Sequence, residues 1–178
     1  AELLGGKGEV IMIMHMPGSA ASMDREKAFA DVIETEFPGI KIVGKQYGMG
    51  DRAKVLAAAE NLLTANPNVD GLFASAEACS VGASRALKAR GLAGKVKFVA
   101  FDASDELIED LEQATIDALV AQDPFRIGYE AVKSIAQKLN GETPPREINL
   151  SARVITPLDL DKPEVKALLF PDLEKYLK

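Results

Sequence analysis

The chain has 178 residues, of which 47% are hydrophobic, and this is enough for one domain with a full core or one domain and part of another. Its 21 basic and 27 acidic side chains give a net charge of −6, which disfavours nucleic acid as a direct partner. The single cysteine, Cys79, excludes an internal disulfide and a cysteine-based metal site, and we expect no metal and no other cofactor.

The first eight residues lack the order of basic, apolar and small regions that marks a signal peptide. They are typical of a linker, or of the end of a helix that runs into a strand. We therefore expect the chain to be a piece of a longer protein. No apolar stretch reaches the length of a membrane span.

Five apolar runs predict buried strands, at residues 9–14, 40–45, 69–74, 97–101 and 116–121. Apolar residues at helical spacing separate these runs, and strand and helix alternate at a spacing typical of βαβ units. Such units form a parallel sheet with helices on both faces. The sequence therefore predicts an α/β fold with a doubly wound parallel sheet over residues 9–122.

The pattern changes after Gln122. A long helix is predicted over 125–139, and a strand with partial alternation over 147–155. A short helix over 164–169 and a charged tail over 172–178, which can also form a helix, complete the chain.

The carboxyl ends of parallel strands meet at one edge of a sheet, where ligands bind in α/β folds. Polar residues follow all five predicted strands. They are Ser19 and Arg25, then Gln46, Asp51 and Arg52, then Ser75 and Glu77, then Asp102, and finally Gln122 and Asp123. This mixture of donors and acceptors suits a neutral polyhydroxylated ligand. It does not suit phosphate, because no glycine-rich phosphate loop is present.

Several of these residues have a second interpretation. Asp102 can instead cap the helix that follows it, and Glu77 can be a favourable charge at a helix N-terminus. His15 can face the cleft or be an ordinary loop histidine. Cys79 lies at a helix start, which lowers a thiol pKa, but without a partnered His and Asp it is interpreted as buried packing.

Six segments together resemble the periplasmic sugar-binding proteins of the ribose-binding type, which have the type I fold. The effector domains of LacI-type repressors share this fold. The segments are residues 19–29 (SAASMDREKAF), 50–54 (GDRAK), 60–63 (ENLL), 68–74 (NVDGLFA), 99–102 (VAFD) and 121–124 (AQDP). The resemblance runs from about residue 8 to about residue 157.

Members of this family have two α/β lobes joined by crossing strands, and they clamp a ligand between the lobes. The resemblance implies that this chain holds only the second lobe and the return into the first. The implied division is a crossing or linker over 1–8, the C-terminal ligand-binding lobe over 9–122, a helix and strand of the N-terminal lobe over 123–153, and the last crossing and tail over 154–178.

The resemblance places Arg25, Asp102 and Gln122 on positions that contact the sugar, and Ser19 and Glu77 complete the candidate ligand-binding set. Two matches fail. Gly50 stands where the family has an aromatic residue that stacks on the ligand, and Ala76 stands where it has an asparagine. The ligand class therefore follows from the resemblance, whereas ribose itself does not.

The implied function is the solute-binding component of a sugar-type ABC transporter, outside the cytoplasm and with its signal sequence removed. Its partners would be a carbohydrate-like ligand and a membrane permease. We expect no enzymatic activity, since no acid, base and nucleophile converge. The alternative is the effector-binding domain of a LacI-type transcription regulator. A phospho-acceptor receiver domain is disfavoured, because it needs an acidic pair where His15-Met16-Pro17 stands. Self-association through the orphan segment 125–153 is a further expectation.

Overall fold

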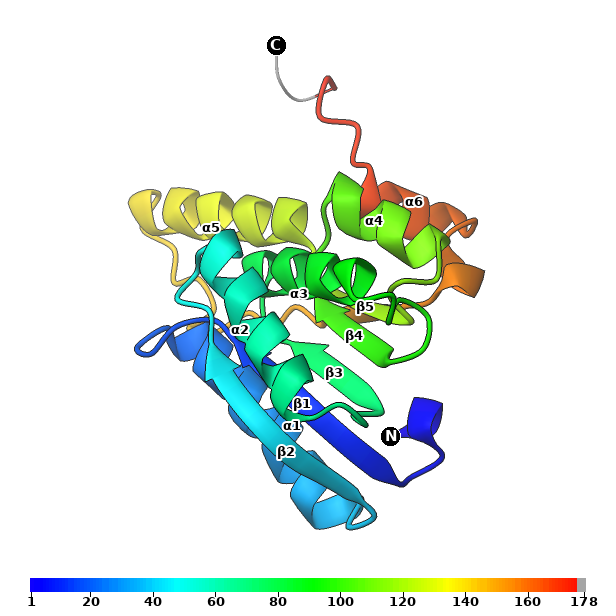
Figure 1. Cartoon of the computed structure of the whole chain (residues 1–178). Helices are drawn as coiled ribbons and strands as arrows, with labels where there is room; N and C mark the ends of the chain where they lie inside the picture. Colours follow the sequence, from blue (N-terminus) through cyan, green and yellow to red (C-terminus); the bar gives the residue numbers. More distant parts are fainter. Residues whose placement is uncertain (176–178) are drawn as a thin grey trace.

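The computed structural model describes residues 1–175 and contains one six-stranded sheet in the order β2-β1-β3-β4-β5-β6 (Figure 1). The strands are β1 (Gly8–Met14), β2 (Ile40–Tyr47), β3 (Gly71–Ala74), β4 (Lys97–Phe101), β5 (Ala118–Ala121) and β6 (Arg153–Ile155). Strands β1 to β5 are parallel, and β6 pairs antiparallel with β5. The predicted doubly wound α/β fold is confirmed, with one antiparallel strand added at its edge.

Helices cover both faces of this sheet. They are α1 (Ala20–Glu36), α2 (Arg52–Ala65), α3 (Glu77–Ala89), α4 (Asp105–Glu112), α5 (Pro124–Leu139) and α6 (Pro163–Leu169), with short 3-10 turns at Glu2–Leu4 and Pro157–Asp159. Helices α2 and α3 lie side by side on one face and α1 lies on the other (Figure 1). Five strand–helix units therefore form where the apolar runs predicted them.

The two faces of the interior strand β1 enter different parts of the core. Ile11 and Ile13 are fully buried in the large cluster that α2, α3, α4 and α6 complete. Met12 packs on the opposite face against Phe73 and Phe29, whose rings stack with centroids 4.2 Å apart. A strand buried on both faces has a continuous apolar sequence, which is why the sequence marks β1 so clearly.

Close contact between α2 and α3 depends on one glycine. A Cβ atom on Gly82 would lie 2.5 Å from Cγ1 of Val55, so a larger residue would force the two helices apart. The start of α2 is fixed by Asp51, whose carboxylate accepts the backbone N–H of Lys54 at 2.8 Å. Asp51 is therefore the N-cap of α2.

The strand predicted over 147–155 is wrong for most of its length. Only Arg153–Ile155 forms a strand, and it pairs with β5 of the same sheet. Residues 147–152 have no strand pairing within the described part of the chain. Alternation alone does not make a strand, because the backbone groups need a neighbouring strand to bond to.

Helix α5 extends away from the sheet, and none of its residues is buried (Figure 1). Val132 is 68% exposed, Ile135 is 61% exposed and Leu139 is 82% exposed. The predicted short helix is confirmed as α6, which buries Val165 against the main core. Residues 172–175 of the predicted tail are not helical, and its residues 176–178 lie outside the described residues.

Two further findings concern residues 1–175. None of the helices there combines the length and the apolar character that crossing a bilayer requires. No group of three or more histidine, cysteine, aspartate or glutamate side chains there is arranged to hold a metal ion.

Candidate ligand-binding site

Arg25 lies at the centre of a polar cluster at the carboxyl edge of the sheet. Its Nη2 donates to Oε1 of Gln122 at 2.8 Å, and its Nη1 lies 3.7 Å from Oδ2 of Asp102. Nη1 also donates to the backbone carbonyl of Ser75 at 3.1 Å. Three of the five predicted site residues, Arg25, Asp102 and Gln122, therefore meet in one place, which we call the arginine cluster.

The topology of the sheet explains why these residues converge. Ser75 follows β3, Asp102 follows β4 and Gln122 follows β5, and these three strands are parallel neighbours. Arg25 comes from the second turn of α1, which begins beyond the end of β1. The three residues of the cluster and the Ser75 carbonyl thus come from the carboxyl ends of four neighbouring strands, as expected for a ligand site in an open α/β fold.

The guanidinium of Arg25 also lies on an aromatic ring. Its Cζ atom is 3.9 Å from the ring centroid of Phe101, the last residue of β4. Phe101 is largely buried, so the cation–π contact holds the plane of the guanidinium against a fixed surface. The hydrogen bonds above use two of the five N–H donors of an arginine, which leaves donors for the hydroxyls of a ligand.

Asp102 has an unusual backbone conformation. Its φ angle is +67°, in the left-handed region that non-glycine residues seldom occupy. Its backbone N–H donates to the carbonyl of Val120 at 3.0 Å, and its Oδ2 accepts the backbone N–H of Glu77 at 3.2 Å. Strained residues of this kind cluster at functional sites.

The alternative interpretation of Asp102 as the cap of the following helix is wrong. That helix, α4, has Ser104 at its N-cap position, and Asp102 instead bonds the first turn of the preceding helix, α3. A carboxylate at a helix N-terminus is favoured by the helix dipole. Asp102 is therefore held at the junction of Arg25 and α3, with its side chain 30% exposed.

The other two candidate residues stand apart from the arginine cluster. The carboxylate of Glu77 forms an ion pair with Arg52, which links α3 to α2, and only its backbone N–H touches the cluster, through Asp102. The hydroxyl of Ser19 donates to that of Ser22 at 3.2 Å at the start of α1. Ser22 Oγ in turn lies 3.2 Å from Nδ1 of His15, so His15 belongs to this loop network.

Sequence reasoning missed Glu26 as part of the site. Its side chain is buried, and its Oε1 accepts the hydroxyl of Ser75 at 2.7 Å. One signal could have revealed it: positions 26, 29 and 33 share one helix face, and Phe29 and Ile33 are core residues. A carboxylate on that face is buried and must find a partner.

Cys79 is buried packing, as interpreted from the sequence. It is fully buried in the main core. Burial and, to a smaller extent, the charge of Glu26 raise the pKa of its thiol to about 12. The lowering expected from its position at a helix start is therefore wrong, because loss of water around a thiolate outweighs the favourable dipole.

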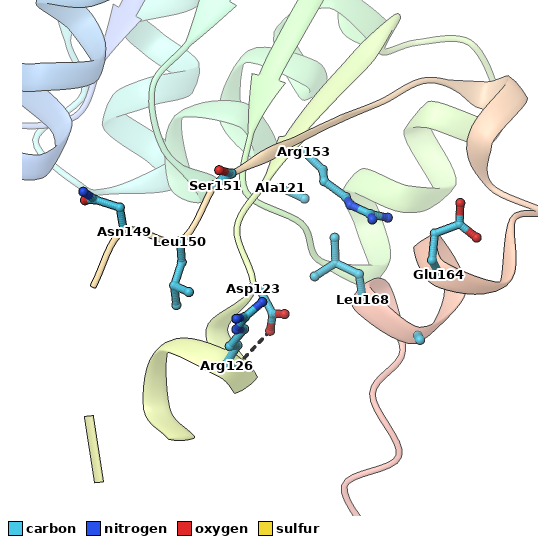
Figure 2. Close-up of a pocket in the computed structure, with 10 residues that line it drawn as sticks. Ala121, Asp123, Arg126, Asn149, Leu150, Ser151, Arg153, Glu164 and Leu168 are labelled. Carbon is cyan, nitrogen blue, oxygen red and sulfur yellow. Dashed lines mark hydrogen bonds between the residues drawn. The ribbon is translucent and has the colours of Figure 1, made fainter. Parts of the chain in front are cut away.

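A separate pocket of about 400 Å³ lies where the chain passes from β5 into α5 (Figure 2). It is lined by Ala121, Asp123, Arg126, Asn149, Leu150, Ser151, Arg153, Glu164, Ala167 and Leu168. Asp123 caps α5 by accepting the backbone N–H of Arg126 at 2.9 Å, the bond drawn in Figure 2. Neither Arg25 nor Asp102 lines this pocket, so it is not the same site as the cluster.

Comparison with known proteins places this geometry in a family. A family model described as a periplasmic binding protein domain matches residues 1–143. A ribose import binding protein of Haemophilus influenzae is 30% identical over 156 residues, which make up 88% of this chain and 52% of that protein. A D-allose-binding periplasmic protein of Escherichia coli is 31% identical over 126 residues, covering 71% of this chain and 40% of that protein.

Solved structures agree in fold. A carbohydrate transporter solute-binding protein from Agrobacterium radiobacter, in complex with D-arabinose, has a TM-score of 0.88 at 32% identity, with 92% of this chain and 55% of that chain covered. An ABC transporter solute-binding protein from Agrobacterium vitis with bound D-fucose has a TM-score of 0.91 at 28% identity, with 95% and 58% covered.

The chain spans about half the length of the curated relatives it matches. The family model covers β1 to β5, α1 to α5 and every residue of the arginine cluster. The chain therefore belongs to the periplasmic binding protein family, and its fold is that of one lobe of the ribose-binding type.

Proposed function

We propose that this chain is the ligand-binding half of a sugar-binding component of an ABC importer, and that the arginine cluster contacts the sugar. The observation that carries the proposal is the convergence of Arg25, Asp102 and Gln122 at the sheet edge. The relatives named above are described as a ribose import binding protein and a D-allose-binding periplasmic protein, and the structure with bound D-fucose is described as an ABC transporter solute-binding protein.

The chemistry of the cluster supports a neutral polyhydroxylated ligand. A sugar hydroxyl both donates and accepts, and the cluster offers a fixed donor in Arg25, an acceptor in Asp102 and both functions in Gln122. The positive charge of Arg25 is balanced by Asp102 at 3.7 Å, so the pair presents no net charge that would select an anion. The guanidinium of Arg25 also lies over the ring of Phe101, which restricts its movement.

We further propose that residues 9–122 are one lobe of a two-lobed protein, with residues 1–8 leading into it. Residues 123–152 would pack on the other lobe, and a last crossing would return the chain to this lobe, where β6 pairs with β5 and α6 packs on the main core. Two observations support this division. The chain covers only about half of its relatives, and the apolar face of α5 is exposed here. A second lobe would cover that face. A dimer of this chain in solution would instead indicate that a second copy covers it.

The same proposal covers location and mode of action. The protein would act outside the cytoplasm, and closure of two lobes on a sugar would create the surface that a membrane permease recognises. Binding would involve no bond-breaking chemistry, so the protein would not be an enzyme. The transport role is favoured over that of a LacI-type regulator, because the relatives reported above are transport proteins.

Calorimetric titration of the full-length protein against pentoses, hexoses and polyols tests this function. We expect saturable binding of at least one member of the panel, with loss of binding in Arg25→Met. A matched control is Arg85→Met, because Arg85 pairs with Glu106 on the outside of α3 and α4 and should leave binding unchanged. Failure of the unaltered protein to bind any polyol would overturn the proposed function.

A further inference from the structure

A buried carboxylate lies directly beneath the arginine cluster. Glu26 is 6% exposed, and it takes part in no ion pair within residues 1–175. Its Oε1 accepts the Ser75 hydroxyl at 2.7 Å and the backbone N–H of His15 at 2.8 Å. Removing a carboxylate from water is unfavourable unless hydrogen bonds replace the water. These two bonds join α1 to the ends of β1 and β3.

Ser75 is the residue that connects this network to the cluster. It is fully buried, and its Oγ also accepts the His15 backbone N–H at 3.1 Å. Its carbonyl oxygen accepts Nη1 of Arg25 at 3.1 Å. Arg25 and Glu26 are consecutive on α1, so one turn of helix holds Ser75 twice, at the hydroxyl through Glu26 and at the carbonyl through Arg25.

We propose that Glu26 and Ser75 are positioning residues for the Arg25 guanidinium, an inference that rests on the proposed function of the arginine cluster. The bond from the Ser75 hydroxyl to Glu26 fixes the peptide whose carbonyl receives Nη1. With its acceptor fixed before the sugar arrives, Arg25 has less side-chain freedom to lose on binding. Glu26 itself does not reach the ligand, because its carboxylate is buried on the core side of α1.

The orientation of Arg25 depends on this support more than on the other contacts. Gln122 and Asp102 are partly exposed and lie on the open side of the cluster, where they must also serve the ligand. Ser75 and Phe101 are its two buried contacts, and Phe101 fixes the plane of the guanidinium but not its rotation within that plane. The Ser75 carbonyl supplies that missing constraint.

A purely structural role for Glu26 makes a different prediction from a positioning role. If Glu26 is purely structural, replacing it lowers stability and weakens binding by the same factor whether or not Arg25 is intact. If Glu26 positions Arg25, replacing it weakens binding only in a protein that still has an arginine at position 25. Lysine keeps the charge of Arg25 but lacks its planar fork of donors, so Arg25→Lys removes the feature that Glu26 would orient.

The test is a double-mutant cycle on sugar affinity, measured by calorimetry on the full-length protein with the tightest-binding sugar of the panel. We expect Glu26→Ala to weaken binding about tenfold, in line with the loss of a hydrogen bond to a charged group. In the Arg25→Lys background the same change should lower sugar affinity less than about twofold, because the effects of substitutions at coupled residues are not additive. Glu26→Gln should stay within about threefold of the unaltered protein, since its amide oxygen can accept both bonds.

Ser75→Ala serves as the second probe where Glu26→Ala does not fold. It removes the same link with little change of volume, and it should weaken binding when Arg25 is intact but not in the Arg25→Lys background. Equal losses in both backgrounds, or no loss in either, would overturn the positioning role while leaving the proposed function intact. If the unaltered protein binds none of the sugars, the proposed function fails first, and the positioning role fails with it.

Discussion

Arg25 donates through Nη2 to Oε1 of Gln122 at 2.8 Å, although 97 positions separate the two residues in the chain. Arg25 follows β1 and Gln122 follows β5, and these two strands are separated in the sheet by β3 and β4. The next residue, Asp123, caps α5. The bond therefore ties the centre of the candidate site to the point where the chain leaves the five parallel strands.

Replacing Gln122 with alanine should weaken sugar binding about thirtyfold. The change removes the acceptor of Arg25 Nη2 and one group able to bond a ligand hydroxyl, each worth about 1 kcal/mol. Calorimetric titration measures the loss. Gln113→Ala is the matched control, because Gln113 is exposed and its amide donates to Glu109 on α4. Unchanged affinity in Gln122→Ala would show that this residue does not take part in binding.

Much of this arrangement follows from the sequence, because its determinants are local. Continuous apolar runs mark strands buried on both faces, and parallel strands end at the same edge of the sheet. Arg25, Asp102 and Gln122 could thus be grouped without coordinates. Their mutual contacts confirm the grouping, and their role in binding stays a prediction.

The remaining features depend on contacts that no local pattern encodes. Every residue has a backbone carbonyl, so the sequence does not indicate that the carbonyl of Ser75 accepts a hydrogen bond from Arg25. The pairing of Glu77 with Arg52, 25 positions apart in the chain, arises because the first turns of α2 and α3 meet in space. The six residues before β6 alternate in polarity as a strand does, but only the partner β5 decides where the strand begins.

The backbone conformation of Asp102 predicts that two substitutions at this position will differ in stability although both weaken sugar binding. Asp102→Gly removes the left-handed strain and should be about 0.5–1 kcal/mol more stable than Asp102→Ala, yet both should lose most sugar affinity. Ala114→Gly is the control, since Ala114 also has a positive φ of 56° but lies on an exposed turn. It should gain stability in thermal unfolding and keep full affinity. Equal stability of the two Asp102 variants would contradict the strain.

Because the carboxylate of Asp110 is buried, replacing its partner Lys88 should lower the stability of the fold more than replacing Lys27, which pairs with an exposed carboxylate. Asp110 is 1% exposed, accepts the Ser84 hydroxyl and pairs with Lys88. Lys88→Met leaves a buried charge without its partner and should cost on the order of 2 kcal/mol. Lys27→Met breaks an exposed pair with Asp31 and should have no measurable effect. Urea unfolding compares the two, and equal midpoints would contradict the prediction.

Cys79 predicts a loss of stability in alkaline solution. Its thiol has a pKa of about 12 in the fold, against an ordinary value of 9.0. Between these values the unfolded chain releases the proton and the folded chain keeps it, so rising pH favours unfolding. The stability that the buried, neutral thiol contributes is therefore fully present below pH 9 and is lost as the pH rises towards 12. Urea unfolding from pH 7 to pH 11 should show a steeper fall for the unaltered protein than for Cys79→Ala, and parallel curves would refute it.

The exposed face of α5 predicts that the effect of one substitution depends on the rest of the protein. Ile135 is 61% exposed in this chain, so Ile135→Ala should leave the unfolding free energy of residues 1–178 nearly unchanged. In the full-length protein a second lobe would bury Ile135, and the same change should then cost about 2 kcal/mol.

Ile33→Ala is the matched control for that comparison, because Ile33 is 5% exposed within this chain and its loss should destabilise both proteins. Amide exchange gives a second measurement. The amides of α5 should exchange faster than those of β1 and β3 in the monomeric 178-residue chain, since none of the residues of α5 is buried. Equal protection in a monomer would show that α5 is stabilised without a second lobe, and slow exchange that depends on concentration would instead identify a second copy of the chain as its cover.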